Sequence, residues 1–146
     1  MAPRVSGQPA EVVRGLYGDW SQGNFASSVD VFHPDVLFQS AVDDKPVRGL
    51  EAMATSIRDV LSTVNEWTLH LEDLIEDGEH VVVRERQHAI GRTSGLPLTT
   101  TLHVAFRVRD AQVTEALWFE NRADAIAAAG MGHKSQLNAL ELHLGQ

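Results

Sequence analysis

The sequence contains no cysteine, few basic residues and no long hydrophobic run. The absence of cysteine excludes disulfide bonds, catalytic thiolates and cysteine-ligated metal sites. Twelve Lys and Arg against twenty Asp and Glu give a net charge of −8, which argues against nucleic acid or a membrane surface as a partner, because both select for clustered basic residues. No window approaches the roughly 18 apolar residues that suggest a membrane-spanning helix, and the N-terminus carries no apolar targeting segment. We therefore expect a cytoplasmic protein.

The sequence has enough apolar residues to form one compact domain. Its 146 residues are 43% hydrophobic, which allows a real core and leaves room for a pocket. Residues 1–9 are rich in Pro, Gly and Ser, and we expect a disordered tail there. The domain is expected over residues 10–130. Residues 131–146 are predicted to form either a tail or a short helix.

The apolar residues of the first half recur at helical spacing. This pattern predicts a helix over residues 10–22, a short helix over 25–32 and the strongest helix over 50–64. A strand over residues 36–41 separates the second helix from the third.

From residue 65 onward the period of the apolar pattern changes to two. Four strands are predicted, over residues 67–75, 80–92, 98–109 and 113–121, and tight turns join them into an antiparallel meander. A last helix is predicted over residues 122–130. Helices followed by strands indicate an α+β protein with its helices on one face of a curved sheet.

The order of these elements, together with the segments FHPDVLFQ, VRGLEAM, DGE and VTEALWFEN, resembles the NTF2-like superfamily and its SnoaL-like domains. The resemblance covers roughly residues 10–130. It implies a cone in which a curved antiparallel sheet wraps around a long helix and leaves a mostly apolar pocket at the open end. It also implies a homodimer formed through the outer sheet face. The superfamily includes isomerases, cyclases, dehydratases, epoxide hydrolases and proteins without catalysis, so the activity stays open.

The catalytic sets of two enzyme groups in this superfamily are largely missing. Ketosteroid isomerases use a Tyr and two Asp residues, and the matching positions here hold Leu16, Ser40 and Val104. Limonene-epoxide hydrolases use an Arg-x-Asp pair, another Asp, a Tyr and an Asn, and the matching positions hold Arg86, His88, Trp118, Phe38 and Ser40. Only the arginine is retained.

The alignment with the epoxide hydrolases also predicts which side chains enter the pocket. It places Arg84, Arg86 and His88 inside, and Glu85 and Gln87 outside. The candidate catalytic residues are Arg86, to stabilise an oxyanion, and His88 or Glu120, to move a proton. The candidate substrate-binding residues are Tyr17, Trp20, Phe38, Ser40, Leu61, Trp67, Arg84, Leu102, Val104, Phe106 and Trp118.

The predicted pocket concentrates the aromatic residues of the chain. Only 6% of the residues are aromatic, yet all three tryptophans fall in or near the predicted pocket. Such a wall suits a flat or polycyclic ligand.

Plainer interpretations of the charged residues stay open. Arg84, Arg86 and His88 would also fit a solvent-exposed strand end, or Arg86 would pair with Glu120 only to satisfy a polar core. Glu120 would also fit as a cap of the following helix. The outer face of the sheet would carry Glu85, Gln87, His103, Ala105, Arg107, Glu115, Leu117 and Phe119. We interpret this mixture of charged and apolar residues as a dimer interface.

The seven histidines show none of the spacings typical of metal sites, and no nucleotide-binding motif is present. We expect no metal and no cofactor. The favoured function is a cofactor-free acid/base enzyme acting on an apolar cyclic molecule of polyketide or terpenoid type, by cyclisation, isomerisation, dehydration or epoxide opening. The alternatives are a non-catalytic small-molecule-binding or regulatory dimer, and an adaptor whose cone is filled by side chains.

Overall fold

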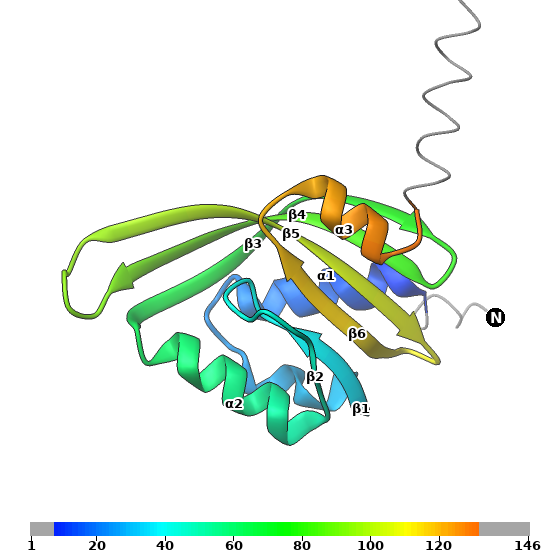
Figure 1. Ribbon diagram of the computed structural model, residues 1–146, viewed down its shortest axis with the longest axis horizontal. Helices are drawn as coiled ribbons and strands as arrows, with labels where there is room; N and C mark the ends of the chain where they lie inside the picture. Colours follow the sequence, from blue (N-terminus) through cyan, green and yellow to red (C-terminus); the bar gives the residue numbers. More distant parts are fainter. Residues whose placement is uncertain (1–7, 132–146) are drawn as a thin grey trace, which may run out of the picture.

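The chain forms an α+β cone, as the sequence predicts (Figure 1). The structure is a computed structural model that describes residues 8–131, so most of both predicted tails lies outside the described residues. The helices are α1 (Pro9–Trp20), the 3-10 helix η2 (Ala26–Val31), α2 (Leu50–Leu61) and α3 (Arg122–Ala128). The strands are β1 (Phe32–Gln39), β2 (Val47–Arg48), β3 (Val64–Asp77), β4 (His80–Gly91), β5 (Pro97–Arg109) and β6 (Gln112–Phe119).

The strands form one sheet in the order β2-β1-β6-β5-β4-β3. The predicted meander is present as β3 to β6, and these strands pair antiparallel. The β1–β6 pair is parallel, and the short strand β2 was not predicted. β1 begins at Phe32, four residues before the predicted start, and its pairing with β6 is irregular between Phe32 and Leu37. This irregular stretch accommodates Pro34, which has no N–H for a regular ladder.

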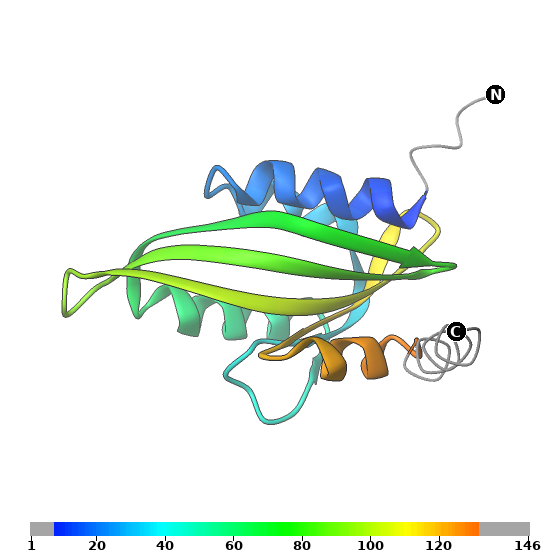
Figure 2. The same ribbon diagram turned by 90° about the horizontal axis from the view of Figure 1, so that it is seen from above.

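Helix α1 forms one wall of the core. Pro9 stands at its first turn, where its missing N–H costs nothing, and Glu11 places a negative charge near the positive end of the helix dipole. Val13, Leu16 and Tyr17 share its buried face. The helix packs mainly against β3, and Figure 2 shows it running alongside the sheet.

Helix α3 departs from the predicted arrangement, because it lies on the opposite face of the sheet from α1 and α2 (Figure 1). Asn121 caps it by accepting a hydrogen bond from the Asp124 N–H at 3.0 Å. Ala125 packs on Val82 and Ala105, and Phe119 packs against the same cluster. Part of the apolar outer face is therefore covered within the chain. Dimerisation through the rest of that face stays a prediction.

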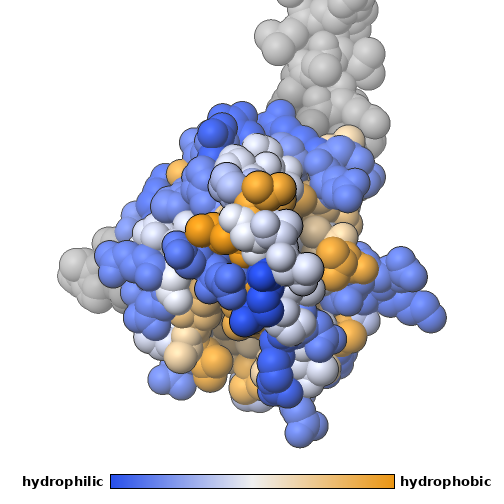
Figure 3. All heavy atoms as spheres, turned by 90° about the vertical axis from the view of Figure 1, so that its left-hand side faces the viewer, coloured by the Kyte–Doolittle hydropathy of each residue, from blue (hydrophilic) through white to orange (hydrophobic). Residues whose placement is uncertain are grey.

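The two ends of the cone differ: one is filled by core side chains, and a hairpin projects from the other. Next to the β3–β4 turn, buried valines and Phe106 pack beneath α1. At the other end the β4–β5 hairpin projects past the helices (Figures 1 and 2). Leu96 and Leu98 near its tip are 62% and 50% exposed, and hydrophobic and hydrophilic atoms are interspersed on this end of the molecule (Figure 3). No helix in residues 8–131 is long and apolar enough to span a bilayer.

Candidate functional site

A cavity of about 310 Å³ lies between α2, η2 and the inner face of the sheet. Its volume is at the low end of the range for small-molecule sites, about 300–1,000 Å³. Apolar cavities of about 150 Å³ bind benzene, so this cavity has room for a ligand of two or three rings. Val29, Val42, Thr100 and Glu120 are exposed lining residues, and they mark its mouth.

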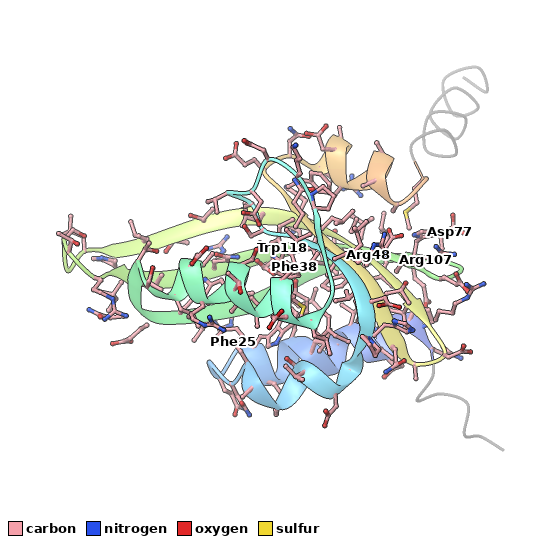
Figure 4. All side chains as sticks on the ribbon, turned by 60° about the horizontal axis from the view of Figure 1, so that its bottom comes forward. Phe25, Phe38, Arg48, Asp77, Arg107 and Trp118 are labelled. Carbon is pink, nitrogen blue, oxygen red and sulfur yellow. The ribbon has the colours of Figure 1, made fainter. Side chains whose placement is uncertain are left out.

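Aromatic rings from distant parts of the chain meet on the cavity wall. The ring centroids of Phe38 and Trp118 are 5.4 Å apart, and Figure 4 shows these two side chains side by side. Phe25 stacks on Trp67 with centroids 4.9 Å apart, and Trp20 lies 6.2 Å from Trp118. Figure 4 also places Arg107 and Asp77 at one end of the molecule, away from these aromatic residues. The aromatic residues thus gather around the cavity and away from that end.

The three tryptophans line the cavity, but each indole N–H is already bonded within the protein. Trp20 Nε1 donates to Ser28 Oγ at 3.1 Å, and Trp67 Nε1 donates to Gln87 Oε1 at 3.0 Å. Trp118 Nε1 donates to both carboxylate oxygens of Glu85, at 3.1 and 3.0 Å. A ligand therefore meets the apolar ring surfaces, which favour stacking on a flat molecule.

A buried polar network centred on Glu85 stands directly behind this wall. Glu85 is fully buried, and Tyr17 Oη donates to its Oε1 at 2.5 Å. Gln87 Nε2 donates to its Oε2 at 2.6 Å. With the two bonds from Trp118, both carboxylate oxygens accept from two donors each. Glu85 has little capacity left for a ligand, and it does not line the cavity.

Burial controls the titration of this network. Burial raises the pKa of Glu85 above its ordinary value, and the hydrogen bonds from Tyr17, Gln87 and Trp118 oppose the shift. Burial also raises the pKa of Tyr17 well above 10, with a further contribution from the neighbouring Glu85. Tyr17 therefore keeps its proton at neutral pH and remains a donor to Glu85.

The predicted inward placement of Arg84, Arg86 and His88 is wrong. All three side chains are exposed on the outer face of β4. Arg84 Nε and Arg86 Nε both pair with Glu72, at 3.3 and 2.8 Å. His88 lies 5.1 Å from His70, measured between ring centroids, and its Nδ1 is 3.3 Å from Thr99 Oγ1. Glu85 and Gln87 point inward instead.

The orientation of the buried valines sets the faces of β4. Val81 and Val83 lie in the core, and β4 pairs with β5 without a register shift, so Glu85 and Gln87 follow on the inner face. The β3–β4 turn pairs Asp77 with His80, and an unbroken ladder from there would place Arg86 opposite the inward-facing Leu71. The register shifts between Leu71 and Asp73, so Leu71 pairs with Glu85 instead. The shift changes the faces of β3 alone: it brings Leu71 and Leu69 to the inner face opposite Glu85 and Gln87, and the alternation of β4 is unchanged.

The other predicted site residues fall into two groups. One group lines the cavity: Trp20, Phe38, Ser40, Trp67, Leu102, Trp118 and Glu120. The other lies near it without lining it: Tyr17, Leu61, Val104 and Phe106. Tyr17, Val104 and Phe106 are buried in the core, and Leu61 is half-buried at the end of α2. The substrate-binding roles themselves stay predictions.

Sequence reasoning missed several lining residues and the residue behind them. The unpredicted lining residues are Phe25, Ser28, Val29, Phe32, Ala41, Val42, Met53, Ile57, Val60, Leu69, Gln87 and Thr100. The spacing of the apolar residues in the helix predicted over 50–64 could have supplied Met53 and Ile57. Gln87 and Glu85 gave no comparable signal, because Val81, Val82 and Val83 are all buried and hide the orientation of β4.

Few polar groups remain free to meet a ligand. Ser40 lines the cavity, and its buried Oγ has no hydrogen-bond partner among residues 8–131. Glu120 is the titratable residue of the lining, and it stands at the mouth. Across the described part of the chain, no three His, Asp or Glu side chains gather in a way that could hold a metal ion.

The fold and this cavity place the protein in a recognisable structural class, the NTF2-like α+β cones. An NTF2-like protein of unknown function from Burkholderia pseudomallei superposes with a TM-score of 0.68, at 19% identity over 82% of this chain and 95% of that one. A protein with a ketosteroid isomerase-like fold from Catenulispora acidiphila, in complex with trimethylamine, gives 0.67 at 15% identity over 85% and 95%. At such identities the likeness concerns the fold alone.

The family follows from the sequence itself. The family model of the SnoaL-like domain matches residues 13–116, so the chain belongs to the SnoaL-like domain family. A proposed SnoaL-like polyketide cyclase from Jannaschia sp. CCS1 is similar in structure, with a TM-score of 0.66 and 19% identity over 82% of this chain and 89% of that one. A search of curated proteins gives no significant match.

Proposed function

We propose that the protein binds a flat, apolar cyclic molecule in the cone cavity and closes a ring on it by cofactor-free acid/base catalysis, with Glu120 moving the proton. The observation that carries the proposal is the cavity itself, which combines three tryptophan faces with a carboxylate at its mouth. Membership of the SnoaL-like family and the likeness to a proposed polyketide cyclase support this reaction class.

The shape and chemistry of the cavity support binding. Its aromatic and aliphatic walls would remove apolar ligand surface from water, which contributes about 25 cal/mol per Å². Phe38, Trp67 and Trp118 come from three different strands, so the fold holds the walls in place before a ligand arrives. A preformed wall lowers the entropic cost of binding.

The proposed chemical step is an intramolecular aldol closure. The Glu120 carboxylate removes a proton from a carbon next to a ligand carbonyl. The resulting enolate carbon attacks a second carbonyl carbon of the same molecule and forms the new C–C bond. Protonated Glu120 returns its proton to the alkoxide oxygen, so that Glu120 ends as it began and no oxidant or reductant is consumed.

The test uses a flat diketone, 1-(2-acetylphenyl)propan-2-one, which closes a six-membered ring and then loses water to give fluorescent 4-methyl-2-naphthol. We expect the wild type to accelerate this reaction and Glu120→Gln to lose at least about a hundredfold in rate, the lower end of what general acid/base catalysis supplies. Glu115→Gln is the matched control, because Glu115 lies on β6, the strand that Glu120 directly follows, but pairs with Arg107 on the outer face. Undiminished turnover by Glu120→Gln would refute the assigned role.

A second candidate, non-catalytic ligand binding, is favoured by one specific observation. Arg86 and His88, which the sequence offers as catalytic partners, lie outside the cavity, and Glu85 is saturated by its own donors. Glu120 is thus left without a second titratable group on the described lining. Binding of the diketone with no cyclisation by the wild type would favour this candidate over the enzyme.

A further inference from the structure

The amide of Gln87 is held by a partner on each side. Trp67 Nε1 can only donate, so the oxygen of the Gln87 amide must face it, and the two atoms are 3.0 Å apart. Gln87 Nε2 then faces Glu85 Oε2, which accepts from it at 2.6 Å. Both partners require the same orientation, because a flipped amide would set its NH₂ group against the indole N–H.

This orientation leaves one donor for a ligand. An amide nitrogen carries two N–H groups, and Glu85 accepts from one of them. The second has no partner among residues 8–131, and Gln87 lines the cavity. Gln87 is half-buried, and a bound ligand would cover its second N–H. A covered donor that stays unpaired is costly, so a ligand that supplies an acceptor gains more there than one that does not.

We propose that Gln87 donates its second N–H to a carbonyl oxygen of the bound ligand, and that Glu85 is the positioning residue that holds Gln87 in place for this contact. The inference rests on the proposed function, because it names the ligand class, flat cyclic ketones, for the same cavity. A carbonyl oxygen fits because it only accepts hydrogen bonds. The Ser40 hydroxyl, buried without a described partner, is a second donor for the same class of ligand.

Glu85 acts through Gln87 rather than on the ligand. It does not line the cavity, and its oxygens are occupied by Tyr17, Trp118 and Gln87. Four bonds to rigid or buried donors fix the carboxylate, which in turn fixes the amide. Support of this kind determines how accurately a binding group is placed.

The experiment compares 9-fluorenone with fluorene, two flat tricyclic probes that differ by the carbonyl group. Binding is followed by quenching of tryptophan fluorescence, since all three indoles line the cavity. We expect the wild type to bind fluorenone about tenfold more tightly than fluorene, the gain of one hydrogen bond. Gln87→Leu should remove this preference while still binding fluorene. Gln112→Leu, at the far end of β6, is the matched control and should keep it.

Two further variants test the positioning role. Glu85→Gln keeps the shape of the side chain but cannot accept from all three donors, so we expect the preference for fluorenone to fall several-fold with fluorene affinity retained. Trp67→Phe, which removes the other partner of the amide, should act in the same direction. In the wild type, the Gln87 side-chain amide NMR signals should shift with fluorenone and stay in place with fluorene.

The outcomes separate this inference from the proposed function. Failure of both probes to bind would overturn the cavity as a binding site and the inference with it. Binding of both probes with equal affinity would overturn the role of Gln87, while the cavity would remain a binding site. So would a preference for fluorenone that survives in Gln87→Leu.

Discussion

Both faces of strand β4 carry charged or polar side chains, but those on one face are buried and those on the other are exposed to solvent. On the inner face, Glu85 is fully buried and accepts hydrogen bonds from Tyr17, Trp118 and Gln87. On the outer face, the side chains of Arg84 and Arg86 are 49% and 46% exposed and share Glu72. The outer face has more charge, but solvent weakens each of its interactions.

This difference shows that burial, rather than the number of charges, decides which polar residues matter for the site. The exposed arginines can exchange Glu72 for water at little cost. Tyr17 and Trp118 have no such replacement, because both are buried and Glu85 itself is closed off behind the cavity wall. The inner residues are therefore expected to control both stability and ligand placement, and the outer residues neither.

The largest expected effect comes from Glu85→Leu. The change leaves Tyr17 Oη, Trp118 Nε1 and the Gln87 amide without their acceptor, and we expect the free energy of unfolding to fall by about 3 kcal/mol or more. Urea denaturation measures it. Glu72→Leu on the neighbouring strand is the matched control and should cost less than about 1 kcal/mol. Equal losses in the two variants would contradict the difference between the faces.

The sequence predicts most of the fold because its patterns are local. The apolar spacing of Val13, Leu16, Tyr17 and Trp20 predicts the buried face of α1, and period-two alternation predicts the meander from β3 to β6. The tryptophans were predicted at the cavity, and they line it. Such signals survive errors of one or two residues at the ends of elements.

The orientation of β4 could not be predicted in the same way. Strand β4 alternates regularly, so its orientation depends on which of its three consecutive valines face the core, and all three valines are buried. Val82 is buried by α3 on the outer face, while Val81 and Val83 are buried in the core, so the valines favour neither orientation. α3 was expected on the face that carries the other helices. With that placement, there was no reason from the sequence to expect that Val82 would be buried on the outer face.

A smaller effect is expected from Tyr17→Phe. The ring keeps its edge-on contacts with Trp20 and Phe106, so the change removes only the hydroxyl that donates to Glu85. We expect a loss of about 1–2 kcal/mol in the free energy of unfolding. Ser27→Ala is the matched control, since it removes an exposed hydroxyl that donates to Asp19 at 3.1 Å, and it should cost less than about 0.5 kcal/mol. An equal loss in the free energy of unfolding for Ser27→Ala would mean that burial does not determine how much these hydrogen bonds contribute to stability.

The pH dependence of stability should also distinguish the faces. Burial raises the pKa of Glu85 in the folded protein above its ordinary value of 4.5, so the folded state holds this proton to higher pH than the unfolded state. The free energy of unfolding should therefore fall as pH rises from about 4.5 through the folded pKa, and level off above it. The fall should be smaller than the effect of Glu85→Leu, because the donors keep their acceptor.

Glu85→Gln provides the comparison for this pH effect. The free energy of unfolding of the wild type minus that of Glu85→Gln, measured by urea denaturation between pH 4.5 and 7.5, should fall as pH rises. Glu79 titrates outside this range, since its hydrogen bond with Arg107 lowers its pKa and its contribution is lost only as pH falls below about 4.5. Burial lowers the pKa of His103, which adds a rise with pH to both proteins and cancels in the difference between them. Identical pH profiles for wild type and Glu85→Gln would show that the carboxyl group titrates normally.

The smallest effect is expected from Arg86→Ala on the outer face. Its side chain is 46% exposed, and Arg84 remains to pair with Glu72, so the loss in the free energy of unfolding should stay below about 1 kcal/mol. In 1 M salt, where charges are screened beyond about 3 Å, the loss should shrink further. Fluorene affinity and diketone turnover should match the wild type, because Arg86 lies on the face opposite to the cavity. Loss of turnover in Arg86→Ala at unchanged stability would instead restore Arg86 as a functional residue, and would require the outer face to meet the substrate.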